Sequence, residues 1–168
     1  MLPLTRPPVS IPAGRRSTDA VTRDMADEAR LVGSYRLKTF RDIADDGEIR
    51  EPLGADPVGF ILYSSERWMT CVLTAAGRPK FAGGDILSGT DAERVAAFAT
   101  SSGYAGRWYI EDGHVVHHLE AATFPNWVGT VQRRPYEFAD DELRLFPPRM
   151  LMNGKMRRSE VFWDRLSR

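Results

Sequence analysis

The stretch Tyr104-Ala-Gly-Arg-Trp-Tyr-Ile-Glu-Asp-Gly-His-Val-Val-His-His-Leu-Glu-Ala-Ala122 contains two strand-like runs on either side of the pair Asp112-Gly113. Such a pair predicts a β-hairpin, because a type I′ turn needs a positive φ at both of its central residues. Two further strand-like runs follow, at residues 128–138 and, after a turn at residues 140–141, at residues 142–146. Short strands joined by tight turns favour an up-and-down sheet, which loses its free edges when it closes into a barrel.

Strand patterns also occur outside this stretch. Residues 33–40 alternate polar with apolar side chains, which is typical of a half-buried strand. Residues 58–63 and 68–73 favour two more strands, and residues 158–166 favour a closing strand. Residues 75–88 are rich in glycine and lack periodicity, so we expect a loop near the mouth of a barrel.

One convincing helix is expected beside this sheet. Thr90 and Glu93 have the spacing of a capping box, in which each side chain accepts a hydrogen bond from an otherwise unpaired backbone amide. This pattern predicts a helix from Asp91 to about residue 101. A short helix is also compatible with residues 24–31.

Residues 1–24 differ in composition from the rest of the chain. They contain several basic and hydroxyl residues and four prolines, namely Pro3, Pro7, Pro8 and Pro12. We therefore predict a flexible N-terminal arm at residues 1–24 and a barrel domain at residues 25–168.

Composition excludes several classes of partner. Lys plus Arg and Asp plus Glu both number 23, so no net field favours nucleic acid or an anionic membrane. The single cysteine, Cys71, cannot form an intrachain disulfide, which fits a reducing compartment. The sequence shows neither the apolar core of a signal peptide nor an apolar run of membrane-spanning length, so a cytoplasmic location is expected.

A set of short motifs, taken in order and spacing, resembles the lipocalin-like domain family of the calycin type. The motifs include Gly33-Ser-Tyr-Arg-Leu37, Pro57-Val-Gly-Phe-Ile-Leu-Tyr63, His117-His-Leu-Glu120, Pro125-Asn-Trp-Val-Gly129 and Trp163-Asp-Arg165. The resemblance covers residues 31–165 and implies an all-β fold, an eight-stranded antiparallel barrel with a central cavity and one short flanking helix. It also implies that Arg165 of the last strand packs on the ring of Tyr35 and closes one end.

The histidines His114, His117 and His118 fall together in the sequence, but a metal site is not expected. On a strand, His117 and His118 point to opposite faces. The face with His117 is the more apolar and is the better candidate for the barrel interior. There His117 is either a general acid or base or a core histidine bonded to a hydroxyl such as Tyr109 or Thr130. The reverse orientation would instead turn His118 and Glu120 inward.

The same alternation applies to Arg133 and Arg134, one of which is expected to point inward with a need for a counter-charge or an anionic ligand. The candidate catalytic residues are His117, Tyr109 and Arg134. The candidate substrate-binding residues are the strand aromatics and one amide, namely Tyr35, Phe60, Trp68, Trp108, Trp127 and Gln132. Trp127 follows a proline at a turn and is expected near the barrel rim.

Two functions remain open from the sequence. One is a cyclase or isomerase, needing no metal or organic cofactor, that folds a polyketide-like hydrophobic substrate and promotes ring closure. The alternative is a non-catalytic intracellular carrier for a hydrophobic small molecule. Converging polar groups inside the barrel would favour the enzyme, and a uniformly apolar interior would favour the carrier. Whether the chain forms a homodimer also remains open.

Overall fold

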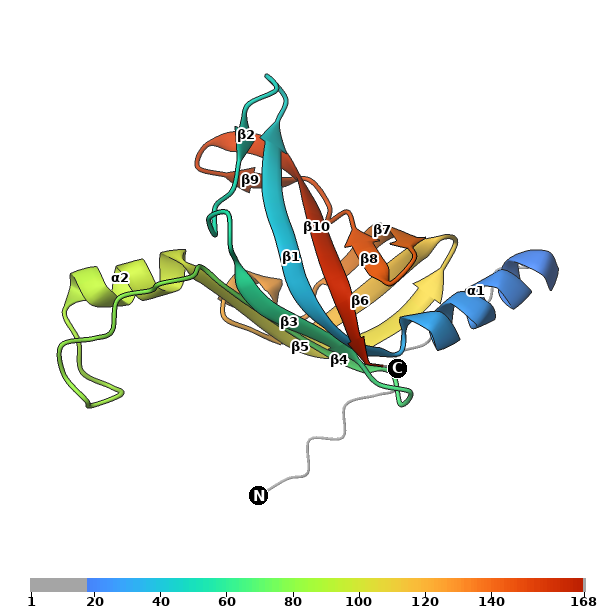
Figure 1. Cartoon of the computed structure of the whole chain (residues 1–168), viewed down its shortest axis with the longest axis horizontal. Helices are drawn as coiled ribbons and strands as arrows, with labels where there is room; N and C mark the ends of the chain where they lie inside the picture. Colours follow the sequence, from blue (N-terminus) through green and yellow to red (C-terminus); the bar gives the residue numbers. More distant parts are fainter. Residues whose placement is uncertain (1–17, 168) are drawn as a thin grey trace.

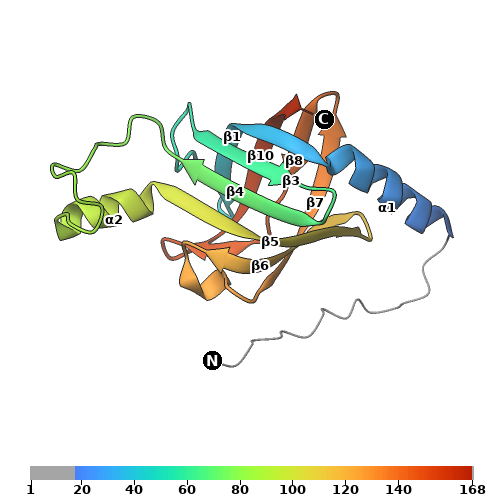
Figure 2. The ribbon, with the colours of Figure 1, turned by 90° about the horizontal axis from the view of Figure 1, so that it is seen from below.

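A single antiparallel sheet closes into a barrel. The computed structural model describes residues 18–167 of the chain. Its ten strands follow the order β2-β1-β3-β4-β5-β6-β7-β8-β10-β9, and pairing of β1 with β10 closes the sheet (Figures 1 and 2). Eight of these strands form the barrel, as expected, and the short strands β2 and β9 extend one rim. The strands are β1 (Gly33–Ala44), β2 (Ile49–Arg50), β3 (Val58–Tyr63), β4 (Trp68–Thr74), β5 (Ser101–Glu111), β6 (His114–Ala122), β7 (Val131–Ala139), β8 (Glu142–Leu145), β9 (Met150–Met152) and β10 (Lys155–Ser167).

Two α-helices flank the barrel: the one predicted from the capping box and a longer form of the helix compatible with residues 24–31. Helix α1 (Thr18–Leu31) begins inside the segment assigned to the arm, and residues 1–17 of that segment lie outside the described residues. Helix α2 (Asp91–Ala99) carries the predicted capping box between Thr90 and Glu93. The two helices extend from opposite sides of the barrel (Figures 1 and 2). A 3-10 turn, η1 (Pro125–Trp127), joins β6 to β7.

One end of the barrel is closed by Tyr35 and Arg165, whose positions pair between β1 and β10. The Arg165 guanidinium carbon lies 4.7 Å from the centre of the Tyr35 ring. The Tyr35 hydroxyl donates to the carbonyl of Leu31 at 2.9 Å, and Arg165 donates to the carbonyl of Val32 at 3.2 Å. These bonds connect the end of α1 to the paired strands β1 and β10, which form the closing seam of the barrel. The packing of Arg165 on the Tyr35 ring, which the family resemblance implied, is present.

The hairpin of β5 and β6 contains a register shift between Ala105 and Gly106. A side chain at Gly106 has no room, because an added Cβ would lie 2.0 Å from the carbonyl oxygen of His118. At Gly103, on the same strand, the nearest atom to an added Cβ would be a methyl carbon of Thr123 at 3.4 Å, which is close to ordinary van der Waals contact. The close approach at Gly106 therefore depends on glycine.

We expect Gly106→Ala to lower the free energy of unfolding by about 3 kcal/mol, because the backbone of β6 must move to admit the methyl group. Gly103→Ala is the matched control and should change it by less than about 1 kcal/mol. Urea denaturation followed by tryptophan fluorescence measures both. Equal effects of the two substitutions would contradict the close strand approach at Gly106.

Candidate functional site

The barrel holds a cavity of about 460 Å³. This volume lies within the roughly 300–1,000 Å³ typical of small-molecule sites. Most of its wall is apolar and includes Leu73, Tyr104, Trp127, Leu145, Val161 and Trp163. Against this background, the few polar side chains that reach the cavity are the informative ones.

Arg134 is the cationic group in the cavity wall. The alternation of β7 buries Gln132 and Arg134 and leaves Arg133 exposed. Arg134 is 3% exposed and donates to Nδ1 of His117 and to Oε1 of Gln132, and its guanidinium carbon lies 5.2 Å from the centre of the Tyr104 ring. The sequence had left open which arginine points inward, and the structure selects Arg134.

One of the three guanidinium nitrogens of Arg134 has no partner in the described part of the chain. Among the described residues, Nε of Arg134 has no hydrogen-bond partner and no carboxylate forms an ion pair with the group. A buried cation in that position is unfavourable unless its donors are satisfied. Because Arg134 lines the cavity, its guanidinium is a cationic donor that an acceptor atom of a ligand can meet there.

His117 holds Arg134 in place. It is fully buried, and its Nε2 lies 2.9 Å from the hydroxyl oxygen of Tyr63. A guanidinium can only donate, so Nδ1 of His117 carries no proton and Nε2–H donates to Tyr63. The partners of His117 are thus Tyr63 and Arg134, not Tyr109 or Thr130. Both ring nitrogens are engaged within the protein, which leaves neither for proton transfer to a ligand.

The other two histidines do not join this group. His118 lies on the opposite face of β6, and Nδ1 of His114 contacts the carbonyl of Asp112 at 2.8 Å. Within residues 18–167, no group of three or more His, Cys, Asp or Glu side chains is arranged to hold a metal ion. His117 also has no carboxylate partner in the described contacts.

Three of the predicted aromatic residues lie inside the barrel. Trp127 lines the cavity near its rim, with its ring edge-on to that of Tyr104 at 5.8 Å. Trp108 and Tyr35 are buried, and both pack edge-on against Tyr63, at 5.2 and 6.3 Å between ring centres. Trp108 and Tyr35 support the wall and the closed end and are not among the residues that line the cavity.

The structure does not bring Phe60, Trp68 or Tyr109 to the cavity. Phe60 and Trp68 are exposed on the outer face, where Arg36 and Arg107 lie over their rings. Tyr109 follows the buried Trp108 and therefore occupies the other face of β5. In each case the side-chain alternation of the strand, which composition alone does not orient, turns the residue outward.

Sequence reasoning missed a polar pair in the cavity wall. Asp42 and Ser159 are directly paired between β1 and β10, both are buried, and both line the cavity. The Ser159 hydroxyl donates to Oδ1 of Asp42 at 2.7 Å. Burial raises the pKa of Asp42, while the Ser159 hydrogen bond and Arg157 act in the opposite direction. The alternation that buries Tyr35 and Leu37, continued along β1, would have placed Asp42 outside, and the register shift between Leu37 and Thr39 turns it inward.

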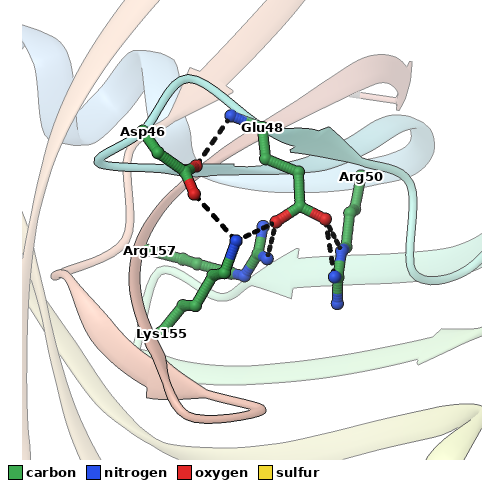
Figure 3. Close-up of polar contacts among 5 residues, drawn as sticks. All are labelled: Asp46, Glu48, Arg50, Lys155 and Arg157. Carbon is green, nitrogen blue, oxygen red and sulfur yellow. Dashed lines mark hydrogen bonds and ion pairs between the residues drawn. The ribbon is translucent and has the colours of Figure 1, made fainter.

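An ion-pair cluster supports the wall beside this pair (Figure 3). Glu48, in the turn between β1 and β2, accepts hydrogen bonds from Lys155 and Arg157 of β10, each at 2.8 Å. Lys155 also donates to Asp46 at 2.8 Å. The hydrogen bonds from Lys155, Arg50 and Arg157 lower the pKa of Glu48 to about 2. The cluster joins the β1–β2 turn to the β9–β10 hairpin at the rim.

The lowered pKa gives the cluster a defined pH dependence. Because the folded-state pKa of Glu48 lies below the ordinary glutamate value of 4.5, its stabilising effect is complete above pH 4.5 and is lost as the pH falls toward 2. We expect Glu48→Gln to be less stable than the unmodified protein at pH 7, with a difference that shrinks below pH 4.5. Urea denaturation across this pH range measures it, with the exposed Glu137→Gln as the control. A difference independent of pH would contradict the role of the Glu48 charge.

Two comparisons with known proteins found similar chains. The chain is 31% identical over 109 residues to the 4'-hydroxy-3'-methoxypropiophenone carrier protein ppsC of Aspergillus oryzae (strain ATCC 42149 / RIB 40), an alignment covering 60% of this chain and 98% of that one. A crystal structure of an uncharacterized protein from Bacteroides eggerthii DSM 20697 matches 81% of this chain and 99% of its own, with 13% identity and a TM-score of 0.40. At that TM-score the similarity adds nothing to the assignment.

The match to a family model is broader. It covers residues 32–166, from the start of β1 to nearly the end of β10, and the model is that of the lipocalin-like domain. In the part of the chain that the structure describes, no helix is long and apolar enough to cross a membrane. The closed barrel and the matched residues agree, and the chain belongs to the lipocalin-like domain family.

Proposed function

We propose that the protein is a carrier that holds a small, mostly apolar molecule in the barrel cavity through an acceptor group hydrogen-bonded to Arg134. The observation that carries the proposal is a buried guanidinium, with its Nε unpartnered among the described residues, in the wall of a mostly apolar cavity. An acceptor such as a carbonyl oxygen satisfies that donor, and the apolar body of the ligand fills the remaining cavity.

The surroundings of Arg134 favour binding over catalysis. His117 and Gln132 fix the guanidinium before any ligand arrives, which reduces the ordering needed on binding. His117 has no free nitrogen, and burial raises the pKa of Tyr63 and of Tyr104, so both phenols stay protonated. The groups around Arg134 therefore present a fixed donor to a ligand without a nearby acid or base.

The curated relative supports the same function. It is named a carrier of 4'-hydroxy-3'-methoxypropiophenone, which is an aryl ketone. Its ketone oxygen is an acceptor of the kind that Arg134 requires, and its aromatic ring suits a wall containing Tyr104, Trp127 and Trp163. This ketone is the first ligand to test.

We expect Arg134→Gln to weaken binding of 4'-hydroxy-3'-methoxypropiophenone at least about tenfold, because a hydrogen bond from a charged donor is lost. Isothermal titration calorimetry measures the dissociation constants. The control is Arg133→Gln, the neighbouring arginine on the outer face, which should change the constant less than about twofold. Thermal unfolding of both variants checks that the barrel remains folded.

Two outcomes would contradict the proposal. One is the absence of binding by the unmodified protein to this ketone and to a panel of hydrophobic aryl ketones. The other is equal loss of affinity in both arginine variants while both remain folded, because the effect would then not depend on the side chain that faces the cavity.

Catalysis is the second candidate, as a cyclase or isomerase acting on a polyketide-like substrate. The observation that favours it is Asp42, a carboxyl in the cavity wall whose pKa is raised by burial. Such a group is suited to accept a proton from a carbon next to a ketone. This chemistry would use Asp42 in place of His117.

Proton exchange separates the two candidates. We expect the protein, as a carrier, to leave the exchange rate of the protons next to the carbonyl of the bound ketone unchanged in D2O, as followed by NMR. Acceleration of this exchange that disappears in Asp42→Asn would instead support the catalytic candidate. Heat-denatured protein is the control for exchange catalysed by solvent or buffer.

A further inference from the structure

We propose that Asp42 and Ser159 form a second recognition point in the same cavity, which selects ligands that carry a hydroxyl group in addition to the acceptor bound by Arg134. The inference rests on the proposed carrier function and names the class of ligand: a hydroxylated aryl ketone, or a compound with the same two groups at separate positions on an apolar body.

The geometry of the pair provides an acceptor facing the cavity. Asp42 is 4% exposed and Ser159 is 2% exposed, and both contribute to the wall. Ser159 donates its proton to Oδ1 of Asp42. In the described part of the chain, Oδ2 of Asp42 has no hydrogen-bond partner. A carboxylate oxygen accepts hydrogen bonds, so the missing partner is a donor.

The charges around Asp42 indicate a neutral donor. Arg157 and Arg50 already act on the carboxyl as positive neighbours. Arg157 is itself 1% exposed, lies two residues before Ser159 on β10 and is bonded to Glu48 (Figure 3). A cationic ligand would add a positive charge beside two guanidinium groups. A phenol or alcohol supplies the hydrogen bond without adding charge.

The two recognition points lie on different parts of the wall. Arg134 is on β7, whereas Asp42 and Ser159 are on the seam of β1 and β10, and β8 lies between β7 and β10 in the sheet. The side chains of Leu145, Val161 and Trp163 on β8 and β10 make the shared wall apolar. A ligand with its ketone at Arg134 and its hydroxyl at Asp42 therefore keeps its apolar body against this surface. The pair fixes the orientation of the ligand as well as its identity.

Three probes of one series test the inference: propiophenone, 4'-hydroxypropiophenone and 4'-methoxypropiophenone. The methoxy compound keeps an oxygen at the same position but cannot donate. We expect the unmodified protein to bind the hydroxy compound about tenfold more tightly than either of the other two, as measured by calorimetry at pH 7, because only its hydroxyl can donate to the carboxylate.

Variants of Asp42 test whether the preference for the hydroxy compound depends on the Asp42–Ser159 pair. Asp42→Leu should reduce the preference to less than about twofold, because the carboxylate that accepts from the hydroxyl is gone. Asp42→Asn serves as the second variant if the leucine protein does not fold, and it should lose at least half of the preference because a neutral amide oxygen is a weaker acceptor. Glu137→Gln, on the outer face, is the matched control and should retain the full preference.

The outcomes separate this inference from the function on which it rests. Equal binding of all three ketones, or a preference that survives in both Asp42 variants, would overturn the role of the pair and leave the carrier function standing. Failure of the unmodified protein to bind any of the three would overturn both.

Discussion

The pairing of β1 with β10 is the constraint on which the rest of the structure depends. It runs in antiparallel register from Ser34 and Ser167 to Ala44 and Arg157, with two register shifts near its start. Without it the strands would form an open sheet with two exposed edges. Closure turns one face of every strand toward a common interior, and only then does a polar side chain on that face become a buried group that needs a partner.

The same seam carries different chemistry at its two ends. At one end, Tyr35 and Arg165 pack together and bind backbone carbonyls at the end of α1, which closes the barrel. At the other, Asp42 and Ser159 form a polar pair in the cavity wall, and the cluster around Glu48 ties the neighbouring turns together. A structural seal and a recognition point thus share two strands, so closing the barrel also builds part of the site.

Arg134 illustrates how a buried charge is accommodated. Its cost of desolvation is offset by a histidine and an amide, and by the face of an aromatic ring, without an ion pair among the described residues. Carboxylate pairing would have neutralised the group and used its donors. Neutral partners leave the group charged and its Nε unpartnered within the described chain, and a cationic donor in the cavity wall suits a carrier of carbonyl compounds.

The sequence by itself indicated the eight barrel strands and the capped helix α2 and favoured the face of β6 that carries His117, because turn signals, capping boxes and alternation are local patterns. It also placed Tyr35 opposite Arg165, through the resemblance to the family.

Tertiary structure decided which inward residues meet. His117, Tyr63 and Arg134 lie on three different strands and meet inside the barrel. Asp42 contacts Ser159 only because β1 pairs with β10. Phe60, Trp68 and Tyr109 show the same limit, because their composition suited a cavity while strand orientation turned them outward. Such contacts depend on register and closure between distant segments, and these are properties of the assembled barrel.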